Sequence, residues 1–197
     1  EEFVKPGIRE SEAAANIEHA LRCMEGVQGM AFQTIVASDN HSCYSHHDVT
    51  DTKIKDNTAV ICDFGVIYKG YCSDITRTVL LGNPGREIKE VYDIVESTQK
   101  EAIKRIRTGN AIGSIDAYIR QVFREYGYAR YFVHSTGHGL GLEVHEAPRV
   151  AWKIEKPLRD GMVFTVEPGI YLPGRFGVRI EDDVIVDTEG RVLGITS

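Results

Sequence analysis

The sequence has few cysteines and no sign of a disulfide framework. Its four cysteines are Cys23, Cys43, Cys62 and Cys72, and no two of them form a CxxC pair. Small secreted domains that depend on disulfides use many closely spaced cysteines, whereas free thiols are common in a reducing compartment. We therefore expect a cytoplasmic protein with unpaired thiols.

Long apolar runs and long basic runs are also missing. No segment approaches the roughly 20 apolar residues that a membrane-spanning helix requires. The opening residues, EEFVKPG, do not have the pattern of a signal peptide, and the net charge of −6 argues against a nucleic-acid partner. We expect neither a membrane nor a nucleic acid to be a partner. Because the chain begins with Glu1 and not with Met, we expect it to be a piece of a longer protein.

The remaining composition is that of an ordinary globular protein. The chain has 197 residues, of which 42% are hydrophobic and 26% are charged. This length suffices for one sizeable domain or two small ones.

Two carboxylates, Asp63 and Asp74, flank a predicted hairpin. Asp63 ends the apolar run Ala59–Cys62, and Asp74 precedes the β-prone run Ile75–Leu81. The residues Tyr68–Tyr71, with Gly70 among them, predict the turn. A hairpin of this length can place both carboxylates on one side of a sheet, and burying two unpaired anions costs several kcal/mol each. We interpret the hairpin as half of a cation site.

Helical periodicity and strand-like runs alternate along the chain. Helices are predicted over Ser11–Gly26, over Arg86–Arg107 and from a cap at Ser114 to Gly127. Strands are predicted at Ala31–Ala37, at Tyr131–Val133, within Gly161–Gly169 and from Gly177 to a last strand that finishes at Ile195. A polar loop between the first strand and the hairpin carries His41, His46 and His47.

The two halves of the sequence resemble each other. Residues 56–65 match residues 160–169 in pattern, because each has a turn acid, an apolar strand, a second acid and a glycine. Glu167 thereby corresponds to Asp63, and Glu181 approximately to Asp74. Each half also has a helix that ends in glycine, an aromatic-rich strand and a histidine-bearing loop. Two copies indicate a duplication and not a solenoid, and a pseudo-two-fold axis would direct four carboxylates, together with His138, at one point.

These motifs together resemble the pita-bread metallopeptidases, and within them the Xaa-Pro peptidases (prolidase and aminopeptidase P). The resemblance rests on DFG…GYCSDITRT from Asp63, HSTGHGLGLEVHEAP from His134, GMVFTVEPGIY from Gly161 and GVRIED from Gly177. It covers nearly the whole chain. It implies an α+β fold, the pita-bread (creatinase/aminopeptidase) fold, with a pseudo-two-fold repeat and an antiparallel sheet covered by helices.

The resemblance also implies a ligand set for two divalent metal ions. Asp63 would bind one ion, Asp74 and Glu181 would bridge both, and His138 and Glu167 would bind the second. Four carboxylates and one imidazole suit Mn²⁺, or else Co²⁺, Fe²⁺ or Zn²⁺. Two such ions lower the pKa of a water that attacks the scissile carbonyl, and Glu167 is favoured as the proton shuttle.

Further residues match substrate-contacting positions of the family. His145 corresponds to a histidine that hydrogen-bonds the substrate or the oxyanion, His46 to a second catalytic-pocket histidine and His134 to one that lines the pocket. Arg179 and Tyr171 match supporting positions of the Xaa-Pro branch, where Arg179 would orient a bridging carboxylate. His41 and His47 have no clear counterpart and are assigned to solvent. For each acid taken alone, the alternative is a structural role without a metal: Asp63 would be a turn residue, and Glu181 would form a surface ion pair with Arg179.

The resemblance implies a hydrolase that cleaves between an N-terminal residue and proline in peptides. A methionine aminopeptidase-like or creatinase-like hydrolase, or a non-catalytic peptide-binding module of the same fold, stays open as an alternative. The family usually has glycine and proline where this chain has Asp39 and Ser45. We expect residues 1–197 to form a single catalytic domain, without the family's N-terminal domain and first helix, and a homodimer as one option for assembly.

Overall fold

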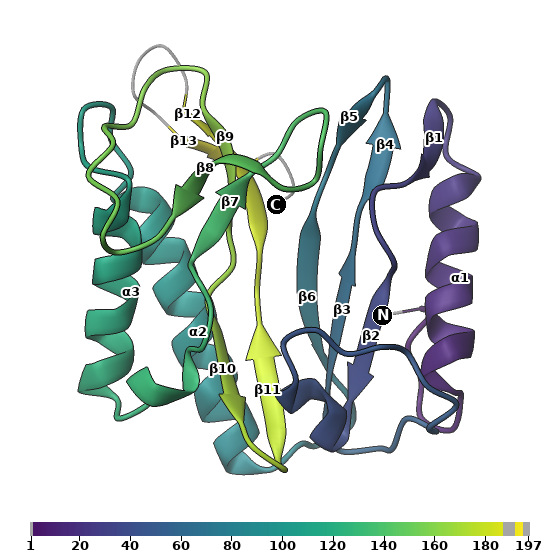
Figure 1. Cartoon of the computed structure of the whole chain (residues 1–197). Coiled ribbons are helices and arrows are strands. Elements are labelled where there is room, and N and C mark those ends of the chain that lie inside the picture. The colour runs from purple at the N-terminus through teal and green to yellow at the C-terminus, as the bar shows by residue number, and fades with distance from the viewer. Residues whose placement is uncertain (1, 187–191, 195–197) are drawn as a thin grey trace.

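The computed structural model describes residues 2–186 and 192–194. The chain folds into two halves that lie side by side, each with strands inside and helices outside (Figure 1). The elements of the first half are α1 (Glu10–Arg22), β1 (Val27–Met30), β2 (Ile35–Ser38), the 3₁₀ helix η1 (Asp39–Cys43), β3 (Ala59–Phe64), β4 (Val66–Tyr68), β5 (Tyr71–Cys72) and β6 (Ile75–Leu80).

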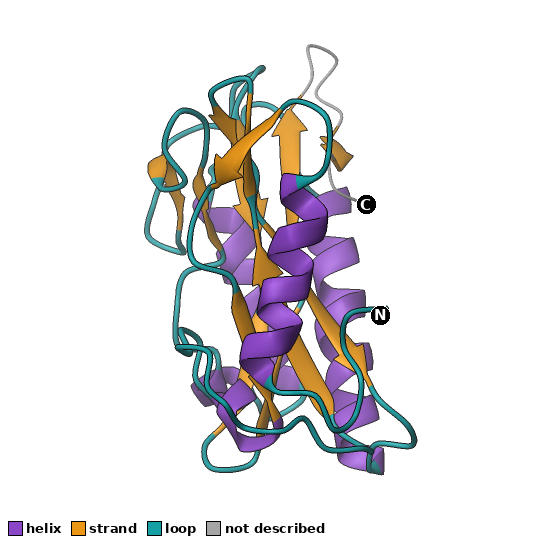
Figure 2. Cartoon of the chain, turned by 90° about the vertical axis from the view of Figure 1, so that its right-hand side faces the viewer, coloured by secondary structure: helices purple, strands orange, loops and turns teal. Residues whose placement is uncertain are grey.

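The second half begins with two helices in place of one. Its elements are α2 (Arg86–Lys104), α3 (Gly113–Glu125), the 3₁₀ helix η2 (Ala129–Tyr131), β7 (Gly137–Gly139), β8 (Glu146–Val150), β9 (Val163–Val166), β10 (Gly169–Leu172), β11 (Phe176–Arg179), β12 (Asp182–Val186) and β13 (Val192–Gly194). Figure 2, viewed from the side of α1, shows the strands running between that helix and the helices behind them.

The strands pair antiparallel throughout the described sheets. The first half has the sheets β2–β3–β6 and β1–β4–β5, and the second half has β13–β12–β9–β7–β8 and the pair β10–β11. In each half an outer strand pair encloses a smaller hairpin: β3 and β6 enclose β4–β5, and β9 and β12 enclose β10–β11. This matching topology is the pseudo-two-fold repeat that the sequence predicts.

The helices bury the apolar stripes that their sequences predict. In α3, Ile115, Ile119 and Phe123 are buried and pack in one core with α2 and with β9–β12. A second core joins the buried face of α1, including Ala13 and Ile17, to β2 and β3. Because apolar burial is the main favourable contribution to folding, each half has its own hydrophobic support beneath its strands.

The predicted cap of α3 is wrong. The helix begins at Gly113, so Ser114 lies inside it, and the Ser114 hydroxyl donates to the carbonyl of Ala111 at 2.7 Å. The backbone N–H groups of Ile112 and Gly113 donate to carbonyls of residues 156 and 154. This pairing orders the chain before Ser114, so the helix is capped at Ile112 and starts two residues earlier than a cap at Ser114 implies.

The strand predicted at Ala31–Ala37 is also wrong in its extent. Residues 27–30 pair with β4, and residues 35–38 pair with β3. Between residues 30 and 35 the chain passes from the sheet of β4 to the sheet of β3. Gly65 lies at the corresponding point between β3 and β4, and its carbonyl accepts from the N–H of Ala31. Two short strands therefore replace one.

Tyr131–Val133 does not start a strand. Residues 129–131 form η2, and the guanidinium of Arg120 on α3 donates to the carbonyls of Phe132 and His134, at 3.1 and 2.6 Å. These carbonyls are therefore occupied by a side chain and not by a neighbouring strand. The aromatic-rich strand expected in the second copy of the repeat is absent at these residues, and the predicted end of the last strand at Ile195 lies outside the described residues.

The expectations of unpaired cysteines and of a hairpin turn near Gly70 are confirmed. The four cysteines are all unpaired, and the hairpin turns at Lys69 and Gly70, which both have positive φ. Within the described residues, the longest helices are too short or too polar to cross a membrane.

Candidate metal centre

A cavity of about 600 Å³ opens between the two halves. Nine of the ten site residues that the sequence predicts line it. They are His46, Asp63, Asp74, His134, His138, His145, Glu167, Arg179 and Glu181. The tenth, Tyr171, is buried behind the wall. The repeat therefore brings residues that are far apart in the sequence to one place.

The four acids occupy matching positions on the two strand pairs. Asp63 is the penultimate residue of β3 and Glu167 directly follows β9, while Asp74 directly precedes β6 and Glu181 directly precedes β12. Acids at the ends of paired strands face the gap between the halves. The side-chain ligand atoms of Asp74, His138 and Glu181 all lie within 4.8 Å of one another.

His138 is oriented as a metal ligand would be. Its Nδ1 lies 3.1 Å from the carbonyl of Gly139, which can only accept, so Nδ1 carries the proton. Burial lowers the pKa of His138, so the ring is neutral and Nε2 presents a lone pair. That lone pair faces Asp74 Oδ2 at 3.6 Å and Glu167 Oε1 at 3.5 Å. A lone pair directed at two carboxylates is unfavourable unless a cation lies between them, and a carbonyl on the other ring nitrogen is the usual partner of a metal-bound histidine.

The acids repel one another strongly in the absence of a cation. Burial, followed by the charge of Asp63, raises the pKa of Asp74 to about 9. Burial also raises the pKa of Glu167 to about 8, and that of Glu181 well above its usual range. Such groups stay ionised at neutral pH only when positive charge is supplied.

Two carboxylate oxygens lack the hydrogen bonds that buried acceptors normally have. Among the described residues, neither Asp63 Oδ1 nor Asp74 Oδ1 has a hydrogen-bond donor, although both are buried. Buried polar atoms without partners are rare in folded proteins. The oxygen-rich donor set, the mutual repulsion and these two oxygens all fit the binding of divalent cations.

Arg179 supports the site from behind. Its guanidinium is buried, and it donates to Asp63 Oδ2 at 2.6 Å and to the Tyr171 hydroxyl at 2.9 Å. It therefore contacts Asp63 directly, and hydrogen bonds link it to Glu181 through Thr76, whose hydroxyl accepts from Arg179 Nε at 3.2 Å and donates to Glu181 Oε2 at 2.5 Å.

The His134 ring is held in one tautomer. Its Nδ1 donates to the Ser135 carbonyl at 2.8 Å, and its Nε2 accepts from the Tyr171 hydroxyl at 2.8 Å. Burial lowers the pKa of His134 to about 4, which keeps the ring neutral. The chain from Arg179 through Tyr171 to His134 thus fixes one wall of the cavity.

His145 and His46 form the accessible part of the lining. His145 is exposed and lies against His138, with ring centroids 4.3 Å apart. His46 is exposed in the loop after η1, and its Nδ1 lies 3.3 Å from the Ser45 hydroxyl. Asp39, where the family usually has glycine, has φ +52°, which is the backbone region that glycine favours.

Sequence reasoning missed the residues that hold the acids. The Thr165 hydroxyl donates to Glu167 Oε1 at 3.4 Å and accepts from the His138 N–H at 3.1 Å. Asp183 Oδ2 accepts the backbone N–H of Asp74 at 2.9 Å. The available signal was spacing: Thr165 lies two residues from Glu167, and Asp183 two from Glu181, so period-2 alternation places each on the same face of its strand.

The alternative roles considered for Asp63 and Glu181 do not hold, and the assignment of His41 and His47 to solvent is wrong. Asp63 lies in strand β3 and is not a turn acid, and Glu181 is buried, so it makes no surface ion pair. His41 and His47 are not simply solvated, because both contact the buried carboxylate of Glu10.

Sequence comparison decides the family. The profile of metallopeptidase family M24 matches residues 1–188. The chain belongs to metallopeptidase family M24. Among individual relatives, an Xaa-Pro dipeptidase from Pyrococcus furiosus is 43% identical over 189 residues, which are 96% of this chain and 54% of the relative.

Solved structures of M24 relatives have the same fold as this chain. A prolidase from Pyrococcus furiosus superposes with a TM-score of 0.95 at 42% identity and covers 100% of this chain and 58% of that one. An X-Pro aminopeptidase from Thermotoga maritima gives a TM-score of 0.94 at 43% identity, covering 100% and 55%. The M24 chain therefore has the pita-bread fold, and it spans about half the length of the curated relatives it matches.

Proposed function

We propose that this M24 chain is the catalytic part of a metal-dependent hydrolase that cleaves the bond between an N-terminal residue and proline. The observation that carries the proposal is the cluster of Asp74, His138 and Glu181, whose ligand atoms lie within 4.8 Å of one another. The relatives named Xaa-Pro dipeptidase and X-Pro aminopeptidase support proline-containing peptides as substrates.

The proposed ligands are Asp63, Asp74, His138, Glu167 and Glu181. Four carboxylates outnumber one imidazole, and this hard, oxygen-rich set favours Mn²⁺, with Co²⁺, Fe²⁺ and Zn²⁺ as the other candidates. Divalent ions bound here would supply Lewis-acid chemistry, because they polarise a carbonyl and lower the pKa of water.

The protein's own groups have distinct proposed tasks. Glu167 is ligand and proton carrier, because its carboxylate borders the open cavity. His145 reaches the cavity from an exposed position beside His138, where it can donate a hydrogen bond to the substrate carbonyl. His46 and His134 lie on the cavity wall, and His134, fixed in one tautomer, presents a rigid surface to the substrate.

Arg179 and Tyr171 keep the acid cluster in place. Arg179 neutralises part of the charge of Asp63 and is itself enclosed by hydrogen bonds to the Ser45 carbonyl and the Tyr171 hydroxyl. Preorganised charge of this kind needs no rearrangement during the reaction.

The test is a substrate panel on protein that has been stripped with a chelator and reloaded with Mn²⁺ or Co²⁺. Release of the first residue from Xaa-Pro dipeptides and from longer Xaa-Pro peptides is measured beside Met-Ala peptides and creatine. We expect hydrolysis of Xaa-Pro bonds only with added metal. Cleavage of Met-Ala peptides or creatine alone would favour the other hydrolases, and metal binding without any hydrolysis would favour a binding module.

We also propose a cytoplasmic compartment. The four unpaired cysteines support a reducing, cytoplasmic setting. The relative activity on dipeptides and longer peptides in the same panel separates a dipeptidase from an aminopeptidase.

A further inference from the structure

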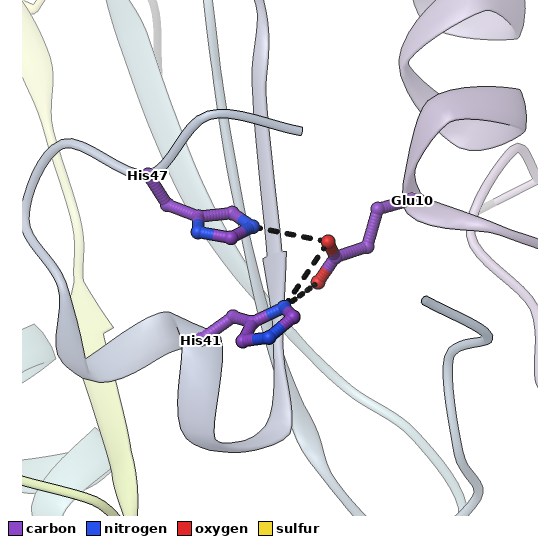
Figure 3. A group of neighbouring side chains, drawn as sticks. All are labelled: Glu10, His41 and His47. Atoms are coloured by element: carbon purple, nitrogen blue, oxygen red, sulfur yellow. Dashed lines mark hydrogen bonds and ion pairs between the residues drawn. The ribbon is translucent and has the colours of Figure 1, made fainter. Parts of the chain in front are cut away.

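A second cluster of potential metal ligands shares no residue with the carboxylate-rich centre. It consists of Glu10 at the start of α1, His41 in η1 and His47 in the loop that follows (Figure 3). Their ligand atoms lie within 4.8 Å of one another. The Glu10 side chain is fully buried, whereas the side chains of His41 and His47 are 23% and 10% exposed.

The two histidines converge on one carboxylate from the same side. His41 Nδ1 lies 3.0 Å from Glu10 Oε1 and 3.2 Å from Oε2, and His47 Nε2 lies 3.0 Å from Oε2. The two rings are stacked, with centroids 4.5 Å apart. Figure 3 shows both nitrogens directed at the carboxylate.

The Glu10 carboxylate already has a full set of donors without the histidines. Glu10 Oε1 accepts from the N–H and the hydroxyl of Ser38, both at 2.8 Å. Glu10 Oε2 accepts from the Thr50 hydroxyl at 2.7 Å and from the Thr50 N–H at 3.3 Å. A carboxylate has about four lone-pair sites. Two imidazole N–H groups would therefore bring six donors to about four acceptor sites.

A cation among the three groups removes this excess. The imidazole nitrogens would then act as ligands through their lone pairs, and Ser38 and Thr50 would hold the ligating carboxylate, as outer hydrogen bonds do in metal sites. Zinc–nitrogen and zinc–oxygen bonds of about 2.0–2.2 Å in a tetrahedral site place ligand atoms roughly 3.4 Å apart. The observed separations of 3.0–3.2 Å are within a few tenths of an ångström of that spacing.

We propose that Glu10, His41 and His47 bind a single Zn²⁺ ion, separate from the metals of the carboxylate-rich centre. Two imidazoles and one carboxylate form a softer set than four carboxylates and one imidazole, and imidazole suits Zn²⁺. Neither histidine has a clear counterpart in the family motifs given above, and neither is a proposed ligand of the carboxylate-rich centre.

The ion would act on the wall of the substrate cavity. It would join α1 to the segment between η1 and β3, in which Ser45, His46 and Asp48 line the cavity together with His47. An ion coordinated by both parts would fix the position of that segment, and with it His46, relative to α1.

The experiment compares zinc content in wild-type protein and in the double variant His41→Asn/His47→Gln. Both proteins are stripped with a chelator, equilibrated with a small excess of Zn²⁺ and dialysed, and zinc per chain is measured by mass spectrometry. We expect the double variant to hold one zinc ion fewer than wild type. The matched control is His19→Gln, which replaces an exposed histidine of α1 and should lose none.

Diffraction from zinc-soaked wild-type crystals provides a second measurement that does not depend on how a variant folds. Data collected at the zinc absorption edge should show an anomalous peak enclosed by Glu10, His41 and His47. Peaks confined to the centre around Asp74, together with equal zinc content in wild type and a folded double variant, would overturn the proposal. Because the count concerns Zn²⁺ outside the carboxylate-rich centre, its failure would leave the proposed hydrolase activity untouched.

Discussion

Thr76→Val should weaken metal binding at the carboxylate-rich centre, and it also removes the hydroxyl that accepts from Arg179 Nε. The Thr76 hydroxyl donates to Glu181 Oε2 at 2.5 Å, and the side chain is fully buried. Valine has nearly the same shape but has no hydroxyl. A hydrogen bond to a charged group contributes about 1.5–3 kcal/mol, and about 1.4 kcal/mol corresponds to a factor of ten. We therefore expect the affinity for Mn²⁺ to fall roughly 10- to 100-fold, the range typical of groups that orient metal ligands.

Thr78→Val is the matched control for this prediction. Thr78 lies two residues further along β6, and its hydroxyl bonds to the backbone of Arg179 and not to an acid. Calorimetric titration of Mn²⁺ into both stripped variants, with a melting curve for each, separates the two roles. The reasoning would be refuted if Thr78→Val lost as much affinity as Thr76→Val, or if Thr76→Val lost stability but no affinity.

Three further perturbations test other parts of the structure. His145→Ala should lower kcat for Xaa-Pro hydrolysis by about 10²–10³-fold, the loss typical of one hydrogen-bond donor to the developing oxyanion, while the metal content is unchanged. A loss of metal would show that His145 acts through His138. Burial raises the pKa of Glu10, but hydrogen bonds, chiefly from Thr50, outweigh burial and hold the pKa at about 2, compared with 4.5 for the free group. The ionised form of Glu10 therefore stabilises the fold above pH 4.5 by up to about 3 kcal/mol. This stabilisation is lost as the pH falls from 4.5 to 2. Urea unfolding of metal-free wild type and metal-free Glu10→Gln should show a difference in free energy of unfolding that becomes smaller over that range. A difference that does not change with pH would contradict this prediction. Gly137→Ala should destabilise the protein, because a Cβ there would lie 2.0 Å from the carbonyl oxygen of Thr165; an unchanged melting temperature would show that β7 can move away.

Local patterns predicted most of the fold, and long-range pairing caused the errors. Hydrophobic periodicity located α2 and the buried stripe of α3, and Gly70 marked the hairpin turn. The errors occur where a distant group takes over a backbone hydrogen bond. The guanidinium of Arg120 donates to the carbonyl of Phe132, so that carbonyl is not free to pair with a strand. The residues around Phe132 do not predict this contact.

The repeat predicted where the site would be, but the local sequence did not predict its support. Corresponding acids in two similar halves must meet when the halves pack about a pseudo-two-fold axis, and nine predicted residues do line one cavity. The hydroxyls of Thr76 and Thr165, and the link from Arg179 to Asp63, depend on register between strands that are far apart in the sequence. The contact of His41 and His47 with Glu10 depends on how a polar loop crosses α1, which no local pattern specifies.

The central claim is that the four acids and His138 hold two metal ions on which hydrolysis depends. Its most direct test is Mn²⁺ content and Xaa-Pro hydrolysis measured together on the same stripped and reloaded samples of wild type and Asp74→Asn. We predict that hydrolysis in wild type returns as Mn²⁺ rises to two ions per chain, and that Asp74→Asn loses both the metal and the activity. Full hydrolysis by metal-free wild type, or by Asp74→Asn without bound Mn²⁺, would contradict the claim.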